Sequence, residues 1–102
     1  MSGYIIASIK VHDPQEYKEY LAGFIDAFRP YDGSIVVATD DLEVLEGEWP
    51  AVRTVVLKFS SIDRAKEWYQ SEQYQKIAHH RFRAATTNMI LVDGFTGQVK
   101  RS

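Results

Sequence analysis

The chain has 102 residues, of which 45% are hydrophobic and 25% charged, the balance of one soluble globular domain with a single core. The absence of cysteine excludes disulfides, thiolate catalysis and cysteine-bound metals. The net charge of −2, with 12 basic and 14 acidic residues interspersed, offers no broad positive face to nucleic acid or an anionic membrane. Residues 1–10 have neither a basic segment nor an apolar run long enough for a signal peptide, so we expect a cytoplasmic protein.

The segment from Tyr4 to Val11 has the two-residue period of a strand. One of its faces is wholly apolar and should pack on helices, because side chains alternate between the two faces of a sheet. The other face mixes apolar and polar side chains, which leaves room for a second sheet to pack there. The apolar face consists of Ile5, Ala7, Ile9 and Val11, and the mixed face of Tyr4, Ile6, Ser8 and Lys10.

A helix should begin after Asp13, which is expected to be its N-cap, with Pro14 at the first helical position and Glu16 completing a capping box. The helix should end at Arg29, because the residue before a proline disfavours the helical conformation. Its apolar stripe is expected to be Tyr17, Tyr20, Leu21, Phe24, Ile25 and Phe28. Residues 31–33 then form a turn.

The middle of the chain predicts a hairpin. Strands are expected at Ser34–Thr39 and Arg53–Phe59, where β-branched residues cluster. Between them, a short extended piece at Leu42–Glu48 is expected before a turn at Trp49 and Pro50.

A second helical layer is expected in two pieces. Ser60, followed by Asp63, should cap the first piece and Ser71 the second, so that the layer bends at residues 70–71. The inward-facing residues are expected to be Ile62, Ala65, Lys66 and Tyr69, with Trp68 beside them, and then Tyr74, Ile77, Ala78, Phe82 and Ala85. The last strand is expected at Asn88–Val92. The chain is thus one domain with a core over residues 3–94 and a tail over residues 95–102.

The predicted order β-α-β-β-α-β indicates an α+β, ferredoxin-like fold, with a four-stranded antiparallel sheet and the helices on one face. No helix is available to cover the other face of this sheet. A second copy of the chain could cover it, and a symmetric dimer is the commonest oligomer, so we expect a homodimer through the sheet face.

A family resemblance rests on residues from Tyr4 to Gly94, and its most specific parts are the turn Glu46-Gly47-Glu48-Trp49-Pro50 and the pattern Trp68-Tyr69-x-Ser71-x-x-Tyr74. The other matching residues are Tyr4, Ile5, Ile6, Asp13, Pro14, Tyr17, Tyr20, Tyr31, Gly33, Phe59, Ser60, Ala65, Arg81, Val92, Asp93 and Gly94. On these residues the chain resembles the bacterial "domain of unknown function 1330" family, within the dimeric α+β barrel group. Asp32 departs from the family pattern, which has a glycine there.

The resemblance implies a ferredoxin-like protomer and a dimer formed face to face through the sheets. It implies no reaction, because the family is defined by an unknown function. Relatives in the wider group include small monooxygenases, isomerases, haem-handling proteins and ligand-binding regulators, and a step from the shared fold to any of these activities is an analogy.

The acidic turn before the third strand holds the first candidate site residues. Glu46, beside the indole of Trp49, could act as a general base or orient a polar ligand. Alternatively, Gly47 makes the turn, Trp49 fills the core edge or a dimer seam, and the carboxylates of Glu46 and Glu48 pair with arginines or water.

Arg81 is the second candidate, because it lies on or beside the inner stripe of the second helical layer, four residues from both Ile77 and Ala85. A guanidinium in that position favours a carboxylate partner, which could be a bound acid or Glu46 of the protein itself. Among the tyrosines of the helices, Tyr20 is the candidate pocket residue, since it lies mid-helix on the inner stripe. Alternatively, these tyrosines are core rings with the hydroxyl at the edge.

The histidines favour no metal site. His79 and His80 point about 100° apart on a helix and cannot bind one metal as a pair, and His12 is distant in sequence. His80 remains a candidate for a ligand contact at a pocket wall, against the alternative of a solvated helix surface.

Two functions therefore stay open. The first is a small homodimer that binds an acidic or aromatic metabolite between helices and sheet, with any catalysis being cofactor-free proton transfer, isomerisation or monooxygenation. Its residues are Glu46 as the tentative catalytic base, Arg81 as the anion anchor, and Trp49, Tyr20 and His80 at the wall. The second is a non-catalytic dimeric interaction module with no small-molecule site. Neither hypothesis includes a cofactor, a nucleic acid or a membrane partner.

Overall fold

The structure, a computed structural model, describes residues 2–50 and 52–95. Its elements are β1 (Gly3–Val11), α1 (Pro14–Phe28), the 3-10 helix η1 (Arg29–Tyr31), β2 (Ser34–Thr39), β3 (Arg53–Phe59), α2 (Ile62–Gln70), α3 (Glu72–Ala84) and β4 (Ala85–Asp93). Residues 96–102 of the expected tail lie outside the described part of the chain.

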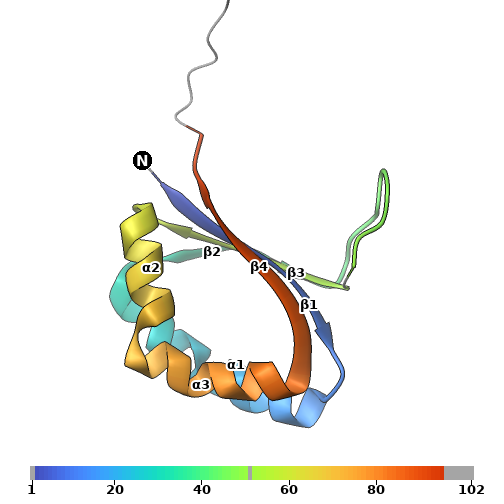
Figure 1. The fold of residues 1–102 in the computed structure, drawn as a ribbon, viewed down its shortest axis with the longest axis horizontal. Coiled ribbons are helices and arrows are strands. Elements are labelled where there is room, and N and C mark those ends of the chain that lie inside the picture. The colour runs from blue at the N-terminus through green and yellow to red at the C-terminus, as the bar shows by residue number, and fades with distance from the viewer. Residues whose placement is uncertain (1, 51, 96–102) are drawn as a thin grey trace, which may run out of the picture.

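The four strands form one antiparallel sheet in the order β2-β3-β1-β4. All three α-helices lie on one face, and the sheet curls over them like an open half-barrel (Figure 1). The predicted ferredoxin-like α+β fold is therefore confirmed. The helices meet the predicted apolar face of β1, where Ile5, Ala7 and Ile9 are buried.

The strand predictions are confirmed for β2 and β3, whereas β4 is longer than expected. It begins at Ala85 instead of Asn88, because β1 pairs with β4 along its whole length, from Gly3 opposite Asp93 to Val11 opposite Ala85. The threonines in this added part lack the apolar pattern of a strand. They are part of β4 because they pair with the distant strand β1.

The predicted helix starts are confirmed with one shift. The Asp13 carboxylate accepts a hydrogen bond from the Glu16 backbone N–H at 3.2 Å and caps α1. Ser61, and not Ser60, caps α2, and its hydroxyl accepts from the Arg64 N–H at 3.0 Å. Ser71 caps α3, and its hydroxyl also donates to the Trp68 carbonyl at 2.7 Å, so one residue joins the two helices at the predicted bend.

The turn after η1 explains the departure at Asp32. This residue adopts a left-handed conformation with φ of 56°, which aspartate tolerates better than most residues. Gly33 is more tightly constrained, because a Cβ there would lie 2.5 Å from the Phe28 ring. Close packing therefore requires a glycine at position 33 but not at position 32.

The core is aromatic and centres on Trp68, which is 1% exposed. Its ring centroid lies 4.1 Å from that of Tyr74, 5.5 Å from that of Phe59 and 5.7 Å from that of Phe28. The expectation that Trp68 only flanks the stripe of α2 is wrong, and Lys66, which was placed on that stripe, is exposed. Because the bend at Ser71 rotates the two helices relative to each other, Trp68 faces the sheet together with Tyr74.

Two further stripe predictions need correction. On α1, Tyr17, Tyr20 and Phe28 are buried, but Leu21 and Ile25 are about half exposed. On α3, Phe82 is about half exposed, and Arg81 takes the buried position instead. The remaining residues assigned to the interior of α3 (Tyr74, Ile77 and Ala78) are buried or partly buried.

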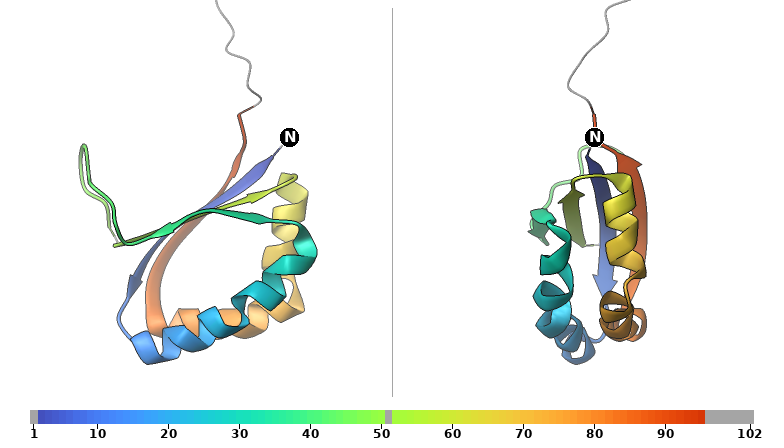
Figure 2. Two further views of the ribbon diagram at one scale, coloured as in Figure 1. Left: turned by 180° about the vertical axis from the view of Figure 1, so that it is seen from behind. Right: turned by 90° about the vertical axis from the view of Figure 1, so that its left-hand side faces the viewer.

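The segment between β2 and β3, residues 40–50 and 52, forms no strand and projects away from the helices (Figure 2). We call it the arm. The expected extended piece at Leu42–Glu48 belongs to it, and Leu45 is 87% exposed there. Trp49 is tied to the sheet, since its indole Nε1 donates to the Thr54 hydroxyl at 3.1 Å.

Candidate functional site

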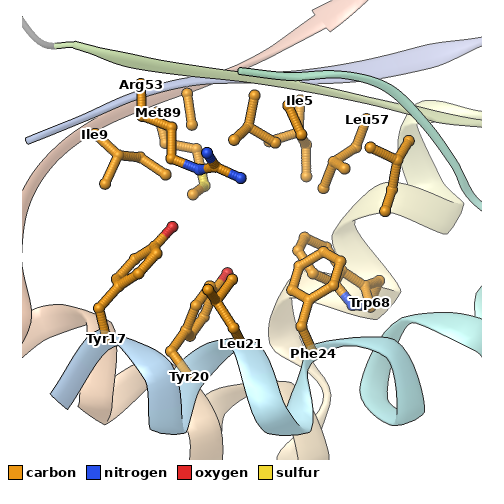
Figure 3. Close-up of a pocket in the computed structure, with 14 residues that line it drawn as sticks. Ile5, Ile9, Tyr17, Tyr20, Leu21, Phe24, Arg53, Leu57, Trp68 and Met89 are labelled. Atoms are coloured by element: carbon orange, nitrogen blue, oxygen red, sulfur yellow. The ribbon is translucent and has the colours of Figure 1, made fainter. Parts of the chain in front are cut away.

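A cavity of about 100 Å³ lies between α1 and the sheet (Figure 3). Its walls are almost entirely apolar. The lining residues are Ile5, Ala7, Ile9, Tyr17, Tyr20, Leu21, Phe24, Ile35, Ala38, Arg53, Val55, Leu57, Trp68 and Met89. Leu21 and Ile35 are about half exposed, so they form the rim through which the cavity meets solvent.

Two polar groups face this apolar space. The Arg53 guanidinium projects from β3 into the cavity, and the Tyr17 hydroxyl points toward it from α1 (Figure 3). Arg53 Nη1 pairs with Asp40 at 3.3 Å, whereas its buried Nε has no hydrogen-bond partner among the described residues. Burial raises the pKa of Tyr17, against the opposing effect of the nearby Arg53 charge, so the phenol is protonated at neutral pH.

Sequence reasoning missed Arg53 as a site residue, although its position carried a signal. Side chains of a strand alternate between faces, and Arg53 shares its parity with Val55 and Leu57, which also line the cavity. Tyr17 was considered with the other tyrosines but not selected. It lies one helical turn before Tyr20, on the same buried face of α1.

Of the predicted site residues, Tyr20 lines this cavity. Its hydroxyl is engaged with the Tyr74 hydroxyl at an O···O distance of 2.8 Å. Burial raises the pKa of Tyr20 well above its ordinary value, and the neighbouring Tyr74 adds to the effect. Tyr20 therefore contributes a ring to the cavity wall, while its polar end is satisfied within the protein.

Arg81 is 4% exposed but does not line the cavity. Its Nη2 donates to the Tyr74 hydroxyl at 3.4 Å, and its guanidinium carbon lies 5.0 Å from the Phe82 ring centroid. Among the described residues it has no carboxylate within ion-pair distance. Glu46, one of the two partners considered for Arg81, forms none of these ion pairs.

Glu46 and Trp49 belong to a different surface. They line a groove between the arm and the outer side of the sheet, together with Val37, Thr39 and Thr54. Glu48 is exposed on the same arm. The structure therefore does not bring Glu46 and Trp49 together with Tyr20 and Arg81.

His80 lies on α3 and faces α1. Its imidazole Nδ1 pairs with the Glu16 carboxylate, which also accepts from Arg83 Nη2 at 2.7 Å. Arg83 and His80 thus both pair with Glu16, and Glu16 serves these pairs in place of the expected capping box. No group of three or more potential metal ligands occurs among residues 2–50 and 52–95. None of the described helices has the length and apolar character that a membrane crossing requires.

The curled antiparallel sheet with its helices on one face is a ferredoxin-like α+β fold, and solved structures of the dimeric α+β barrel type share it. The chain belongs to the family described as "Domain of unknown function (DUF1330)", whose profile matches residues 2–95. The resemblance found in the sequence is therefore confirmed. No curated protein matches the chain.

Several solved structures share the fold. A protein of unknown function from Rhodopseudomonas palustris is 14% identical, with a TM-score of 0.75 over 93% of this chain and 83% of its own. SnoaB, a cofactor-independent oxygenase from Streptomyces nogalater, is 16% identical, with a TM-score of 0.62 over 97% of this chain and 98% of its own. A putative antibiotic biosynthesis monooxygenase from Caulobacter crescentus is 15% identical, with a TM-score of 0.60 over 92% and 90% of the two chains. At these identities the likeness shows the fold alone.

Proposed function

We propose that the protein binds a small, mainly apolar molecule with one anionic group in the cavity between α1 and the sheet. The observation that carries this proposal is the Arg53 guanidinium, which points into an apolar space and whose Nε has no hydrogen-bond partner among residues 2–50 and 52–95. A buried donor without an acceptor costs free energy, and a charged donor costs more. A carboxylate in the cavity would satisfy this donor and accept a second hydrogen bond from Tyr17.

The size of the cavity limits the ligand. A dry cavity of about 150 Å³ holds benzene in a well-studied case, and this one measures about 100 Å³. A single aromatic ring or a short alkyl chain is therefore the largest group that can enter. Its entry requires a change of rotamer in a side chain at the rim. Leu21 is suited to that movement, because it is 45% exposed and exposed side chains change rotamer quickly.

The lining supports binding more strongly than catalysis. Among the described lining residues there is no carboxylate and no imidazole, so the cavity itself offers no base for proton abstraction at neutral pH. Cofactor-free isomerisation or oxygenation, with Glu46 as a base, has support only from the fold shared with enzymes such as SnoaB. We therefore place ligand binding first and chemistry on the ligand second.

Met89 provides a probe for the test. It lines the cavity, and the chain has only one other methionine, Met1. In protein with a ¹³C-labelled methionine methyl group, benzoate should shift the Met89 signal saturably. Its neutral isostere benzamide should bind more weakly than benzoate, by a factor of about ten or more. The factor follows because a hydrogen bond to a charged group contributes about 1.5–3 kcal/mol.

Two variants complete this experiment. Arg53→Leu should abolish the preference for benzoate over benzamide, whereas Arg29→Leu, which removes an exposed arginine of η1, should leave it unchanged. Equal binding of the two molecules to the wild-type protein, or a preference that survives in Arg53→Leu, would refute the role of Arg53. No response of Met89 to benzoate or to butyrate would refute the site.

The alternative function, a dimeric interaction module, also has an observation in its favour. Opposite the helices, the outer face of the sheet carries an apolar patch, in which Ile6 is paired in register with Val56 and Ile90. Ile90 is 57% exposed, and the arm beside this face presents Leu45 and Trp49. We infer that a second copy of the chain covers this face, as in the dimeric group to which the fold belongs. The oligomeric state of an outer-face variant tests the inference.

A further inference from the structure

Arg81 carries a charge for which the described residues provide no carboxylate counter-ion. Its side chain is buried, and arginine does not lose its proton in proteins. The faces of Tyr20 and Phe82, at 5.7 and 5.0 Å, provide cation–π contacts, and Tyr74 accepts one hydrogen bond. Nε has no partner among the described residues. A buried charge of this kind is costly unless an anion is near it.

A recess opens beside this guanidinium and is separate from the cavity at Arg53. It is lined by Tyr69, Arg81, Phe82, Ala85, Thr87 and Met89. The recess and the cavity share Met89 but none of the polar groups, since Arg53 and Tyr17 line only the cavity. The two sites can therefore be altered independently.

Thr87 provides a second unsatisfied group in the same recess. Its hydroxyl is buried and has no hydrogen-bond partner among the described residues. Thr87 shares the parity of Met89 on β4, which turns both side chains toward the helices. Two residues line this one opening between α3 and β4, and each has a buried donor, one of them charged, without a partner in the described part of the chain.

We propose that this recess binds a small carboxylate, held by Arg81 Nε–H and the Thr87 hydroxyl. A carboxylate has two oxygens and accepts one hydrogen bond on each, which matches two donors better than a single halide ion does. The rings of Tyr69 and Phe82 flank the opening, so the carboxylate can belong to a molecule with an apolar remainder. This site goes beyond the cavity ligand and does not depend on it.

The test is an acetate titration followed by the Nε–H resonance of Arg81 at constant ionic strength, with chloride as the balancing anion. Acetate should shift this resonance saturably. Thr87→Val, which has nearly the same shape, should weaken acetate binding about tenfold, because it removes one donor to a charged group. Thr86→Val is the matched control, since residue 86 is exposed on the opposite face of the sheet, and it should bind acetate as the wild type does.

A purely structural role gives a different result. Without a ligand, Thr87→Val replaces an unsatisfied buried hydroxyl by a methyl group and should leave stability unchanged or raise it, with no effect on acetate. An Arg81 resonance that does not respond to acetate, or that responds equally in Thr87→Val, would overturn the proposal. If phosphate shifts the Arg81 resonance as acetate does, the proposal of a site specific for carboxylates would be overturned in favour of a general oxyanion site. Arg53→Leu should retain acetate binding, which separates a failure here from a failure of the cavity proposal.

Discussion

At the scale of single residues, Trp68 makes the largest contribution to the core. Its indole contacts rings from three other elements: Phe28 of α1, Phe59 of β3 and Tyr74 of α3. Aromatic pairs with tilted or edge-to-face geometry contribute about 0.5–1.5 kcal/mol each beyond the burial of their surface. Trp68 therefore ties the bent helical layer to both α1 and the sheet.

Trp68→Ala should lower the free energy of unfolding by about 3–5 kcal/mol, because it removes buried surface and leaves a cavity that the surrounding rings cannot fill. Chemical denaturation followed by circular dichroism measures this loss. Phe95→Ala removes an aromatic ring that is 74% exposed and should change the stability by less than about 0.5 kcal/mol. A loss below about 1 kcal/mol for Trp68→Ala would show that the core can close around the gap.

The two proposed ligand groups differ in how the protein treats their charge. Arg53 has Asp40 at 3.3 Å as a partial counter-charge, whereas the contacts of Arg81 within the described part of the chain are with aromatic faces and a phenol. Each guanidinium keeps a buried Nε without a partner among the described residues. Since native proteins satisfy most of their buried donors, these two atoms are the places where a bound acceptor would change the free energy most.

At the scale of secondary structure elements, Glu16 joins α1 to α3 at the surface. The carboxylate pairs with His80 and Arg83, and α1 and α3 approach closely at Gly23, where a Cβ would lie 2.7 Å from Ile77 Cγ2. The hydrogen bond from His80, followed by the one from Arg83, lowers the pKa of Glu16.

This ion pair predicts a pH dependence. A carboxyl group whose pKa is lower in the folded state stabilises the fold above its unfolded pKa, about 4.3 for glutamate, and loses this contribution as the pH falls through the folded value. Glu16→Gln should therefore melt below the wild type at neutral pH, and the difference should vanish in acid. Thermal unfolding between pH 7 and pH 3 measures it.

Glu19→Gln is the control for this measurement. Glu19 is exposed on the same helix and forms none of the ion pairs among the described residues. Its substitution should give a small difference in melting temperature that does not vary with pH in this way. A Glu16→Gln difference that stays constant down to pH 3 would mean that Glu16 stabilises the contact between α1 and α3 by packing and not by charge.

At the scale of the whole molecule, the sheet uses its two faces differently. One face is curled over the helices, while the other is open and bordered by the arm (Figures 1 and 2). The cavity lies on the side of the helices. Exposed apolar patches are typical of interaction surfaces. The arm and the outer face together provide a surface that a second copy of the chain can cover.

Ile90→Glu should convert the proposed dimer to a monomer without unfolding it. Ile90 is exposed in the protomer, so the glutamate meets water there, whereas in a dimer it would bring an unpaired charge into an apolar interface. Sedimentation should give twice the chain mass for the wild type and the single chain mass for the variant. Circular dichroism should show the same fold for both.

Ile25→Glu makes the same change on α1, where the isoleucine is also about half exposed but lies on the helical side. It should leave the dimer intact. A wild-type protein that sediments as a monomer at every concentration, or an Ile90→Glu variant that still forms a dimer, would refute an interface on the outer face and leave the arm groove without a known occupant.

Much of the fold could be predicted from local patterns. Asp13 and Ser71 were identified as caps because a cap depends on a side chain and a backbone group only three residues apart. The bounds of β2 and β3 followed from β-branched runs between turn residues. The length of β4 could not be predicted in this way, because Thr86 and Thr87 join the sheet through pairing with β1, more than 70 residues earlier in the chain.

The candidate site was harder to predict than the fold. Glu46, Trp49 and Arg81 are unusual residues in the sequence, but the structure places the first two at a groove and the third in a buried position away from both the groove and the cavity. The cavity instead uses Arg53 and Tyr17, which local patterns had assigned only to a strand and a stripe. Residue type indicates which side chains can bind a ligand, whereas their meeting depends on packing between distant elements.

The order of the elements, most of their caps and the apolar faces follow from local sequence, because they depend on side chains within a few residues of one another. Which polar groups share a cavity depends on the packing of distant elements. The curl of the sheet turns Arg53 toward Tyr17, the bend at Ser71 brings Trp68 to the centre of the core, and the arm carries Glu46 away from the helices. Each outcome follows from long-range packing. The apolar faces of the helices and the sheet are buried against one another, and this packing fixes where the polar side chains lie.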